Sequence, residues 1–149
     1  MTEISFYHLQ TVPLERALPK LVEKVLASGA RAVIMLGSEE RVAELDTVLW
    51  TFHPDSFLPH GTARDGRAGD QLAWLTTADE NPNGAGVLIL ADGATSAKLA
   101  QYEKCLDIFD GGDAAAVAAA RERWRVFKDS GHRVTYWQQD QSGRWQQKT

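Results

Sequence analysis

Cysteine is almost absent from this chain of 149 residues, since Cys105 is the only one. A single cysteine excludes an internal disulfide, and the length is sufficient to bury one hydrophobic core without such a cross-link. The sequence also lacks an apolar run of the ~20 residues that cross a bilayer, and its start lacks the basic and apolar segments of a secretory signal. We therefore expect one domain, residues 1–149, that is cytoplasmic and makes no membrane contact.

Positive charge is also scarce, because 16 lysines and arginines face 20 aspartates and glutamates and give a net charge of -4. A protein that grips the phosphate backbone of a nucleic acid broadly does so through many lysine and arginine contacts. The excess of acid argues against such a surface. Any role on DNA is therefore expected to be indirect.

Short apolar runs alternate with segments of helical periodicity along the chain. The runs predict strands at residues 4–9, 32–36, 71–76, 87–91, 104–109 and 133–138, with a turn at 142–143 leading into a small hairpin. The periodic segments predict helices at residues 14–28, 38–50, 97–101 and 114–130. This order predicts an α/β fold with a mainly parallel sheet flanked by helices on both faces, Rossmann-like in outline.

The turns of this predicted sheet do not carry a nucleotide-binding loop. After the strand at 32–36 the chain reads Gly-Ser-Glu-Glu, whose two carboxylates would repel a phosphate. Gly84 and Gly86 form a Gly-x-Gly pattern, but it precedes a predicted strand instead of following one. We predict no cofactor. A nucleotide-binding α/β enzyme with a degenerate phosphate loop stays as an alternative.

Candidate catalytic and metal-binding residues are few. His53, Asp55 and His60 lie close in sequence, but the intervening prolines and aromatics favour a structural or hydrogen-bonding role over a metal site. Cys105 lies in an apolar strand without a neighbouring histidine and is interpreted as a buried small hydrophobe. The sequence therefore predicts no catalytic residue and no bound metal.

Aromatic side chains gather in residues 45–60, which read LDTVLWTFHPDSFLPH. The members of this group are Trp50, Phe52, Phe57 and Leu58. Trp50 lies off the apolar stripe of its helix, and grouped apolar side chains at a surface often mark an interaction site. The residues alone leave a second reading open, in which Trp50 and Phe57 close one end of the core.

The helix at 114–130 carries a cationic and aromatic stripe. Val117, Arg121, Trp124 and Lys128 follow one another at spacings of four, three and four residues, with Arg123 and Arg125 beside them. Arginine binds a terminal carboxylate in bidentate fashion and tryptophan offers a flat apolar wall, so the stripe suits an acidic peptide. The alternative is a solvated helix face whose arginines pair with nearby acids.

Three segments resemble the chi subunit of bacterial DNA polymerase III, an accessory protein of the clamp loader. They are ISFYHL at residues 4–9, LDTVLW with SFLPH in 45–60, and ARERW at 120–124. The resemblance runs from about residue 4 to 132 and is weakest over residues 62–83 and in the tail. It implies a non-catalytic replisome adaptor that binds two protein partners.

The first implied partner is the acidic, Phe-terminated C-terminal tail of single-stranded DNA-binding protein. By resemblance, Arg121 would meet the tail carboxylate and Trp124 would supply the aromatic wall, while Ile108 and Phe109 would line the apolar part. Val117 stands where better-known members carry a lysine. The affinity for the tail is then either lower, or maintained by Arg125 and Lys128.

The second implied partner is the small psi subunit, which connects chi to the clamp loader. Its implied contacts are Trp50, Phe52, Phe57 and Leu58. Two alternatives remain for this surface, namely another protein such as a helicase, and self-association.

Overall fold

The structure is a computed structural model that describes residues 2–51 and 59–148. Its strands are β1 (Glu3–Leu9), β2 (Ala32–Met35), β3 (Ala73–Thr76), β4 (Val87–Leu90), β5 (Lys104–Asp110), β6 (Arg133–Gln139) and β7 (Trp145–Gln147). Its helices are α1 (Leu14–Ala27), α2 (Glu39–Thr51) and α3 (Ala114–Asp129), with 3-10 turns η1 (Ala68–Asp70) and η2 (Leu99–Gln101). The elements lie where the sequence predicted them, although residues 97–101 contribute only the turn η2.

The strands form one sheet in the order β3-β2-β4-β5-β1-β6-β7. Every neighbouring pair is parallel except β6 and β7, which form the predicted antiparallel hairpin. The mainly parallel sheet is therefore confirmed. Because β1 pairs with both β5 and β6, the first strand lies inside the sheet and directly beneath α3.

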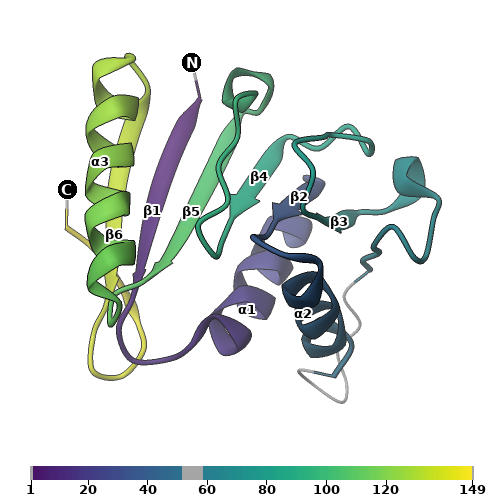
Figure 1. The fold of residues 1–149 in the computed structure, drawn as a ribbon, viewed down its shortest axis with the longest axis horizontal. Helices are drawn as coiled ribbons and strands as arrows, with labels where there is room; N and C mark the ends of the chain where they lie inside the picture. Colours follow the sequence, from purple (N-terminus) through teal and green to yellow (C-terminus); the bar gives the residue numbers. More distant parts are fainter. Residues whose placement is uncertain (1, 52–58, 149) are drawn as a thin grey trace.

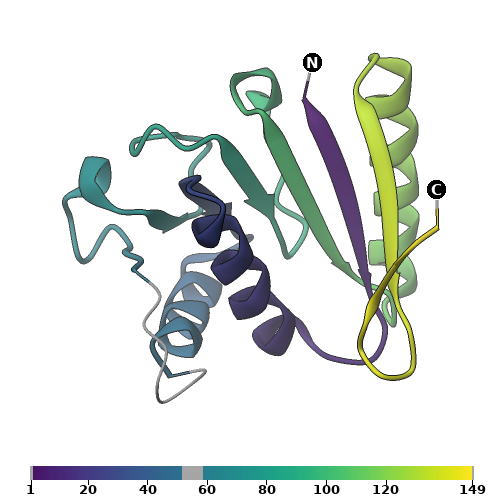
Figure 2. The same cartoon turned by 180° about the vertical axis from the view of Figure 1, so that it is seen from behind.

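Helices cover both faces of the sheet, as predicted (Figures 1 and 2). On one face, Leu18 of α1 and Leu45 of α2 share a core cluster with Ile34 of β2. On the other face, α3 packs over a second cluster that contains the fully buried Phe6 of β1. The described helices α2 and α3 therefore lie on opposite faces and toward opposite edges of the sheet. No described helix has the length and apolar character needed to cross a membrane.

Side-chain caps set where α2 and α3 begin. The Asp113 carboxylate accepts hydrogen bonds from the backbone N–H groups of Ala115 and Ala116, at 3.0 and 3.3 Å. The Ser38 hydroxyl accepts one from the backbone N–H of Arg41 at 3.1 Å. The Asp113 cap fixes the start of α3 soon after β5 and so determines which α3 side chains face the sheet.

Two features of the sequence serve packing. Cys105 is fully buried, and burial raises the pKa of its thiol, which confirms its interpretation as a small hydrophobe. A Cβ atom on Gly37 would lie 2.7 Å from the carbonyl oxygen of Asp92. Gly37 therefore allows the chain segments that follow β2 and β4 to approach closely.

Candidate functional site

A hollow of about 610 Å³ opens between α3, the end of β5 and the middle of β6, and we name it the α3 pocket. Its lining consists of Phe109, Val117, Ala120, Arg121, Trp124, Arg125, Lys128, Asp129 and Tyr136. The four residues of the predicted stripe all belong to this lining. The structure thus brings together residues that the sequence predicted to lie along one side of the helix.

The aromatic side chains of the α3 pocket are anchored in the core. Trp124 is half-buried, and its ring centroid lies 5.7 Å from that of Phe6 and 5.9 Å from that of Tyr136. The Lys128 ammonium lies 5.7 Å from the centroid of Trp124, within the range of a cation–π contact. The pocket therefore has a rigid aromatic floor and a cationic rim.

The cations of the rim are not neutralised by strong internal ion pairs. Arg121, Arg125 and Lys128 are exposed, and among the described residues no ion pair involves Arg121 or Lys128. Arg125 approaches Glu122 at 3.7 Å, but both side chains are largely exposed and such pairs are weak. The rim therefore presents positive charge to an incoming ligand. This arrangement favours a binding site over the alternative interpretation, in which the arginines of α3 pair with nearby acids.

Arg123, which the sequence placed beside the stripe, points elsewhere. Its guanidinium donates two hydrogen bonds to Asp107 of β5, at 2.7 and 2.9 Å. Burial raises the pKa of the Asp107 carboxyl, and the neighbouring Arg123 lowers it in part. Arg123 is therefore a structural partner of a buried carboxylate and does not belong to the pocket.

One residue predicted for the apolar part of the pocket lies on the wrong face. Ile108 packs in the cluster under α1, whereas Phe109 packs under α3 and lines the pocket. Neighbouring residues of a strand point to opposite faces, so the two cannot both meet α3. We correct the prediction for Ile108 on this ground.

Sequence reasoning missed Tyr136 of β6, which lines the pocket, and His8 of β1, which contacts Tyr136. The pairing of β1 with β6 sets Phe6 opposite Tyr136 and brings both onto the α3 face. The alternation of side chains divides residues 133–138 between the two faces of the strand, but it does not say which face lies under α3. Knowledge that β6 lies beside β1 would have singled out Tyr136.

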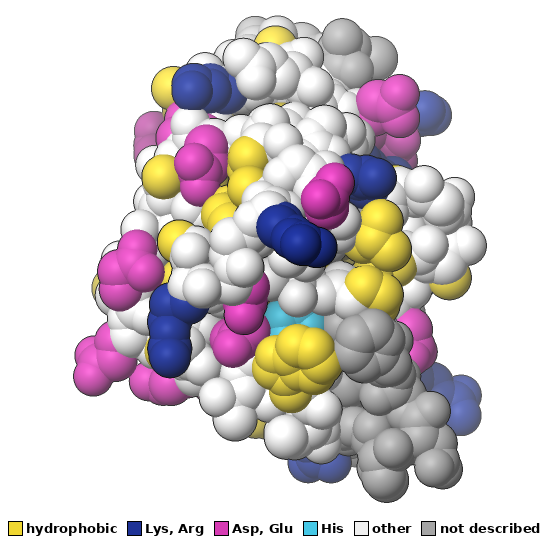
Figure 3. Space-filling view, turned by 90° about the vertical axis from the view of Figure 1, so that its right-hand side faces the viewer, with side chains coloured by type: hydrophobic (Ala, Val, Ile, Leu, Met, Phe, Trp, Pro, Cys, Tyr) yellow, Lys and Arg dark blue, Asp and Glu magenta, His cyan; other side chains and the backbone are white. Residues whose placement is uncertain are grey.

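The second predicted surface lies at the end of α2. Trp50 is 49 % exposed, so its indole does not close the core. Figure 3 shows the face of the molecule at the β3 edge, where an exposed hydrophobic side chain lies against a histidine and beside the residues that are not described. Phe52, Phe57 and Leu58, predicted to share this surface, lie outside the described residues.

His60 supports the position of Trp50. The His60 side chain is fully buried, and its Nε2 forms a hydrogen bond of 3.3 Å with the backbone carbonyl oxygen of Asp46 on α2. The same nitrogen lies 3.0 Å from a carboxylate oxygen of Asp46. Its ring centroid lies 4.6 Å from that of Trp50. The hydrogen bond to Asp46 is the kind of role that the sequence favoured for His60. His53 and Asp55 lie outside the described residues. In the described part of the chain no group of three potential metal ligands occurs.

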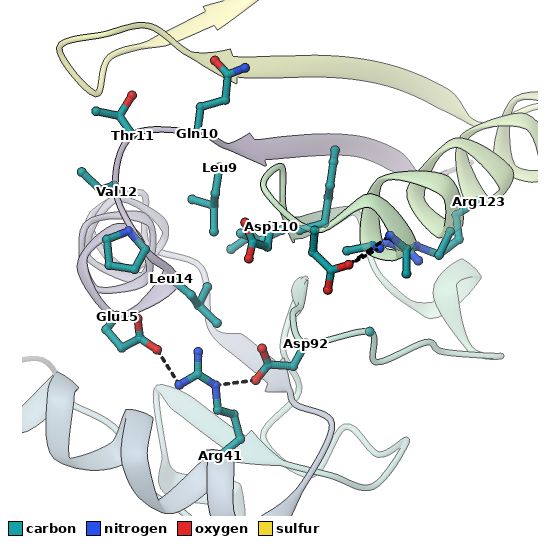
Figure 4. Close-up of a pocket in the computed structure, with 18 residues that line it drawn as sticks. Leu9, Gln10, Thr11, Val12, Leu14, Glu15, Arg41, Asp92, Asp110 and Arg123 are labelled. Atoms are coloured by element: carbon teal, nitrogen blue, oxygen red, sulfur yellow. Dashed lines mark hydrogen bonds and ion pairs between the residues drawn. The ribbon is translucent and has the colours of Figure 1, made fainter.

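A second cavity, of about 750 Å³, lies at the carboxyl ends of β1, β4 and β5 (Figure 4). Parallel α/β sheets commonly bind nucleotides at this edge. Here Arg41 contacts Glu15 at 2.5 Å and Asp92 at 2.6 Å, and Asp110 and Asp113 add further acid to the lining. The second cation of the lining, Arg123, is already paired with Asp107. A site with this balance of charge repels phosphate, which argues against the nucleotide-binding alternative.

Comparison with known proteins agrees with this arrangement. A family model described as DNA polymerase III chi subunit, HolC, matches residues 1–135. The chain belongs to the chi subunit family. The matched residues include α2, α3 and every lining residue of the α3 pocket except Tyr136 in this chi-family chain.

A curated relative supports the same family. The "Probable DNA polymerase III subunit chi" of Rickettsia prowazekii (strain Madrid E) is 29% identical over 109 residues. The match covers 73% of this chain and 66% of the relative, just under two thirds of its length. The resemblance carried by the three sequence segments is therefore confirmed at the level of the chi family, while the roles of individual residues stay predictions.

Proposed function

We propose that this chi-family chain is a non-catalytic adaptor of the replisome. It joins the DNA polymerase III clamp loader, through the psi subunit, to the C-terminal tail of single-stranded DNA-binding protein. The observation that carries the proposal is the α3 pocket, where three exposed cations surround an anchored aromatic floor. DNA is reached only indirectly, through the coating protein.

The α3 pocket matches the chemistry of an acidic peptide that ends in phenylalanine. Arg121 binds the terminal carboxylate, since a guanidinium pairs with a carboxylate in bidentate fashion. Trp124 and Phe109 take the phenylalanine ring, and Arg125 and Lys128 attract the acidic residues that precede it. These two cations offset the absence of a lysine at Val117.

Psi binds at the end of α2, where the half-exposed Trp50 is the described anchor. Aromatic anchors of this kind commonly dominate the energy of an interface. The buried contact of His60 with Asp46 holds a second ring against the indole and limits its motion. The anchor is therefore pre-organised before psi arrives.

The two surfaces lie far enough apart to be occupied together. α2 packs on one face of the sheet near the β3 edge, and α3 packs on the other face near the β6 edge (Figure 1). A rigid sheet connects them. Joint occupancy raises the effective concentration of the polymerase assembly near the coated strand even when each contact is moderate.

The tail assignment is tested on the peptide side. A fluorescent peptide with the acidic, Phe-terminated sequence is titrated with the chain, alongside the same peptide whose terminal carboxylate is converted to an amide. The amide is expected to bind about tenfold more weakly or worse, because a hydrogen-bonded charge at Arg121 is lost. Affinity of the free-acid peptide also falls as salt rises. Equal affinity for both peptides would contradict the assignment.

The psi assignment is tested by Trp50→Ala. This change is expected to weaken psi binding about 30-fold, because it removes a central aromatic anchor. Binding is measured by calorimetry, with Val126→Ala as the control, since Val126 is 50 % exposed on α3 and outside both surfaces. Wild-type affinity of Trp50→Ala for psi, or capture of a helicase with no binding of psi, would overturn the assignment.

A further inference from the structure

His8 lies at the end of β1, directly behind the α3 pocket. Its Nδ1 forms a hydrogen bond with the Tyr136 hydroxyl, and its ring centroid lies 5.0 Å from that of Phe109. Both of these neighbours line the pocket. A Cβ atom on Gly111 would lie 2.0 Å from His8 Nε2, so the turn after β5 packs closely against the other edge of the ring. The imidazole is thus fixed in place and linked to the pocket by one hydroxyl.

Charged and titratable groups face His8 from each element packed around it. Arg121 acts from α3, Asp110 acts from the end of β5, and the Tyr136 phenol contacts it from β6. Burial lowers the pKa of His8, the positive charge of Arg121 lowers it further, and Asp110 partly opposes them. His8 is therefore neutral at pH 7 in the empty pocket, and the cation that most disfavours its protonation is the proposed carboxylate anchor.

We propose that His8 takes up a proton when an acidic peptide occupies the α3 pocket, which makes it a proton-linked positioning residue for that ligand. The inference rests on the function proposed above for the same pocket. It adds a regulation, namely a tail affinity that depends on pH near neutrality.

Two steps link occupancy of the α3 pocket to protonation of His8. A carboxylate bound at Arg121 neutralises the charge that repels a proton from His8, so binding raises the tendency of the imidazole to protonate. When Nδ1 carries no proton, the Tyr136 hydroxyl donates to it. When Nδ1 gains a proton from solvent, it donates to the Tyr136 oxygen, and the hydroxyl hydrogen is released to donate to the peptide.

The sign of the pH dependence follows from linkage. The bound state holds more protons than the free state, so affinity rises as pH falls through the range in which His8 protonates. The affinity stops rising once the pH is low enough for His8 to be protonated in both the free and the bound protein. The carboxylates of the peptide stay ionised between about pH 6 and pH 8, because their ordinary pKa values lie near 4. The peptide carboxylates therefore add nothing to the pH dependence of the affinity between these two values.

The test is a titration of the acidic, Phe-terminated peptide at pH 6 and pH 8 with three variants. Wild type is expected to bind several-fold more tightly at pH 6, and at most about tenfold, which is the limit for a rise of one in the pKa of one histidine. His8→Asn keeps a hydrogen-bonding atom near Nδ1 but does not titrate, and it should bind equally at both values. Tyr136→Phe keeps the aromatic floor but removes the hydroxyl, and it should have a smaller slope than wild type.

The control is His132→Asn, since His132 lies before β6 and its Nδ1 accepts a hydrogen bond from the backbone N–H of Thr2. It should keep the wild-type slope. NMR titration of the His8 ring, with and without saturating peptide, reports the pKa directly and should show it rising on binding. An unchanged His8 pKa, or a wild-type slope in His8→Asn, would overturn the inference and leave the tail pocket intact. Failure of wild type to bind at either pH would overturn the proposed function, and the inference with it.

Discussion

Replacing Arg121 with glutamate is expected to weaken binding of the acidic tail peptide by about 30-fold or more, because charge reversal at a carboxylate anchor costs at least about 2 kcal/mol. The side chain is exposed, so the substitution should leave the fold unchanged. Anisotropy of the labelled peptide measures the affinity, and circular dichroism checks the fold. The size of the effect follows from the position of Arg121 on the rim, where no described acid pairs with it.

Arg16→Glu is the matched control for this change. Arg16 is exposed on α1, on the opposite face of the sheet, and its reversal alters the net charge by the same amount. A general electrostatic effect would weaken binding equally in both variants. The tail assignment predicts a large loss only for Arg121→Glu, and equal losses would count against it.

Replacing Arg123 with alanine is expected to lower the free energy of unfolding by about 3 to 5 kcal/mol at pH 7, because it leaves a buried carboxylate unpaired. Asp107 is 2 % exposed, and both of its oxygens accept hydrogen bonds from Arg123. Urea unfolding measures the change. Arg125→Ala is the control, since its exposed pair with Glu122 is worth at most about 1 kcal/mol.

The loss in Arg123→Ala should shrink as pH falls. Burial raises the pKa of Asp107 even beside Arg123, and removal of that cation raises it further. A carboxyl whose pKa is higher in the folded state than in the unfolded state stabilises the fold when protonated, and this contribution is lost as pH rises. Acidification from pH 7 toward pH 5 should therefore narrow the gap to wild type. A gap that widens on acidification would contradict this account of Asp107.

Most of the fold could be predicted from the sequence because its signals are local. The apolar runs around Ile34 and Ile89 mark strands that are covered on both faces, and the structure places them in the middle of the parallel part of the sheet. Asp113 and Ser38 are residue types that commonly cap helices, and each directly precedes a helix that it caps. Helical spacing likewise grouped Arg121 with Trp124 correctly.

The errors concern contacts between distant parts of the chain. Alternation separates Ile108 from Phe109, but it does not say which of them faces α3, because that depends on where β5 lies in the sheet. Tyr136 and His8 meet through a pairing of strands about 130 residues apart in sequence. The ion pair of Arg123 with Asp107 was missed for the same reason, because it joins α3 to a carboxylate among the apolar residues in the middle of β5.

The adaptor role is tested most directly by asking whether one chain binds both partners at once. Purified psi and the acidic tail peptide, each labelled with a different dye, are mixed with this chain and analysed by sedimentation velocity. The account predicts one species that contains all three components, with tail affinity unchanged by psi, because the surfaces lie on opposite faces of the sheet. Displacement of the peptide by psi, or failure of either partner to bind, would contradict the account.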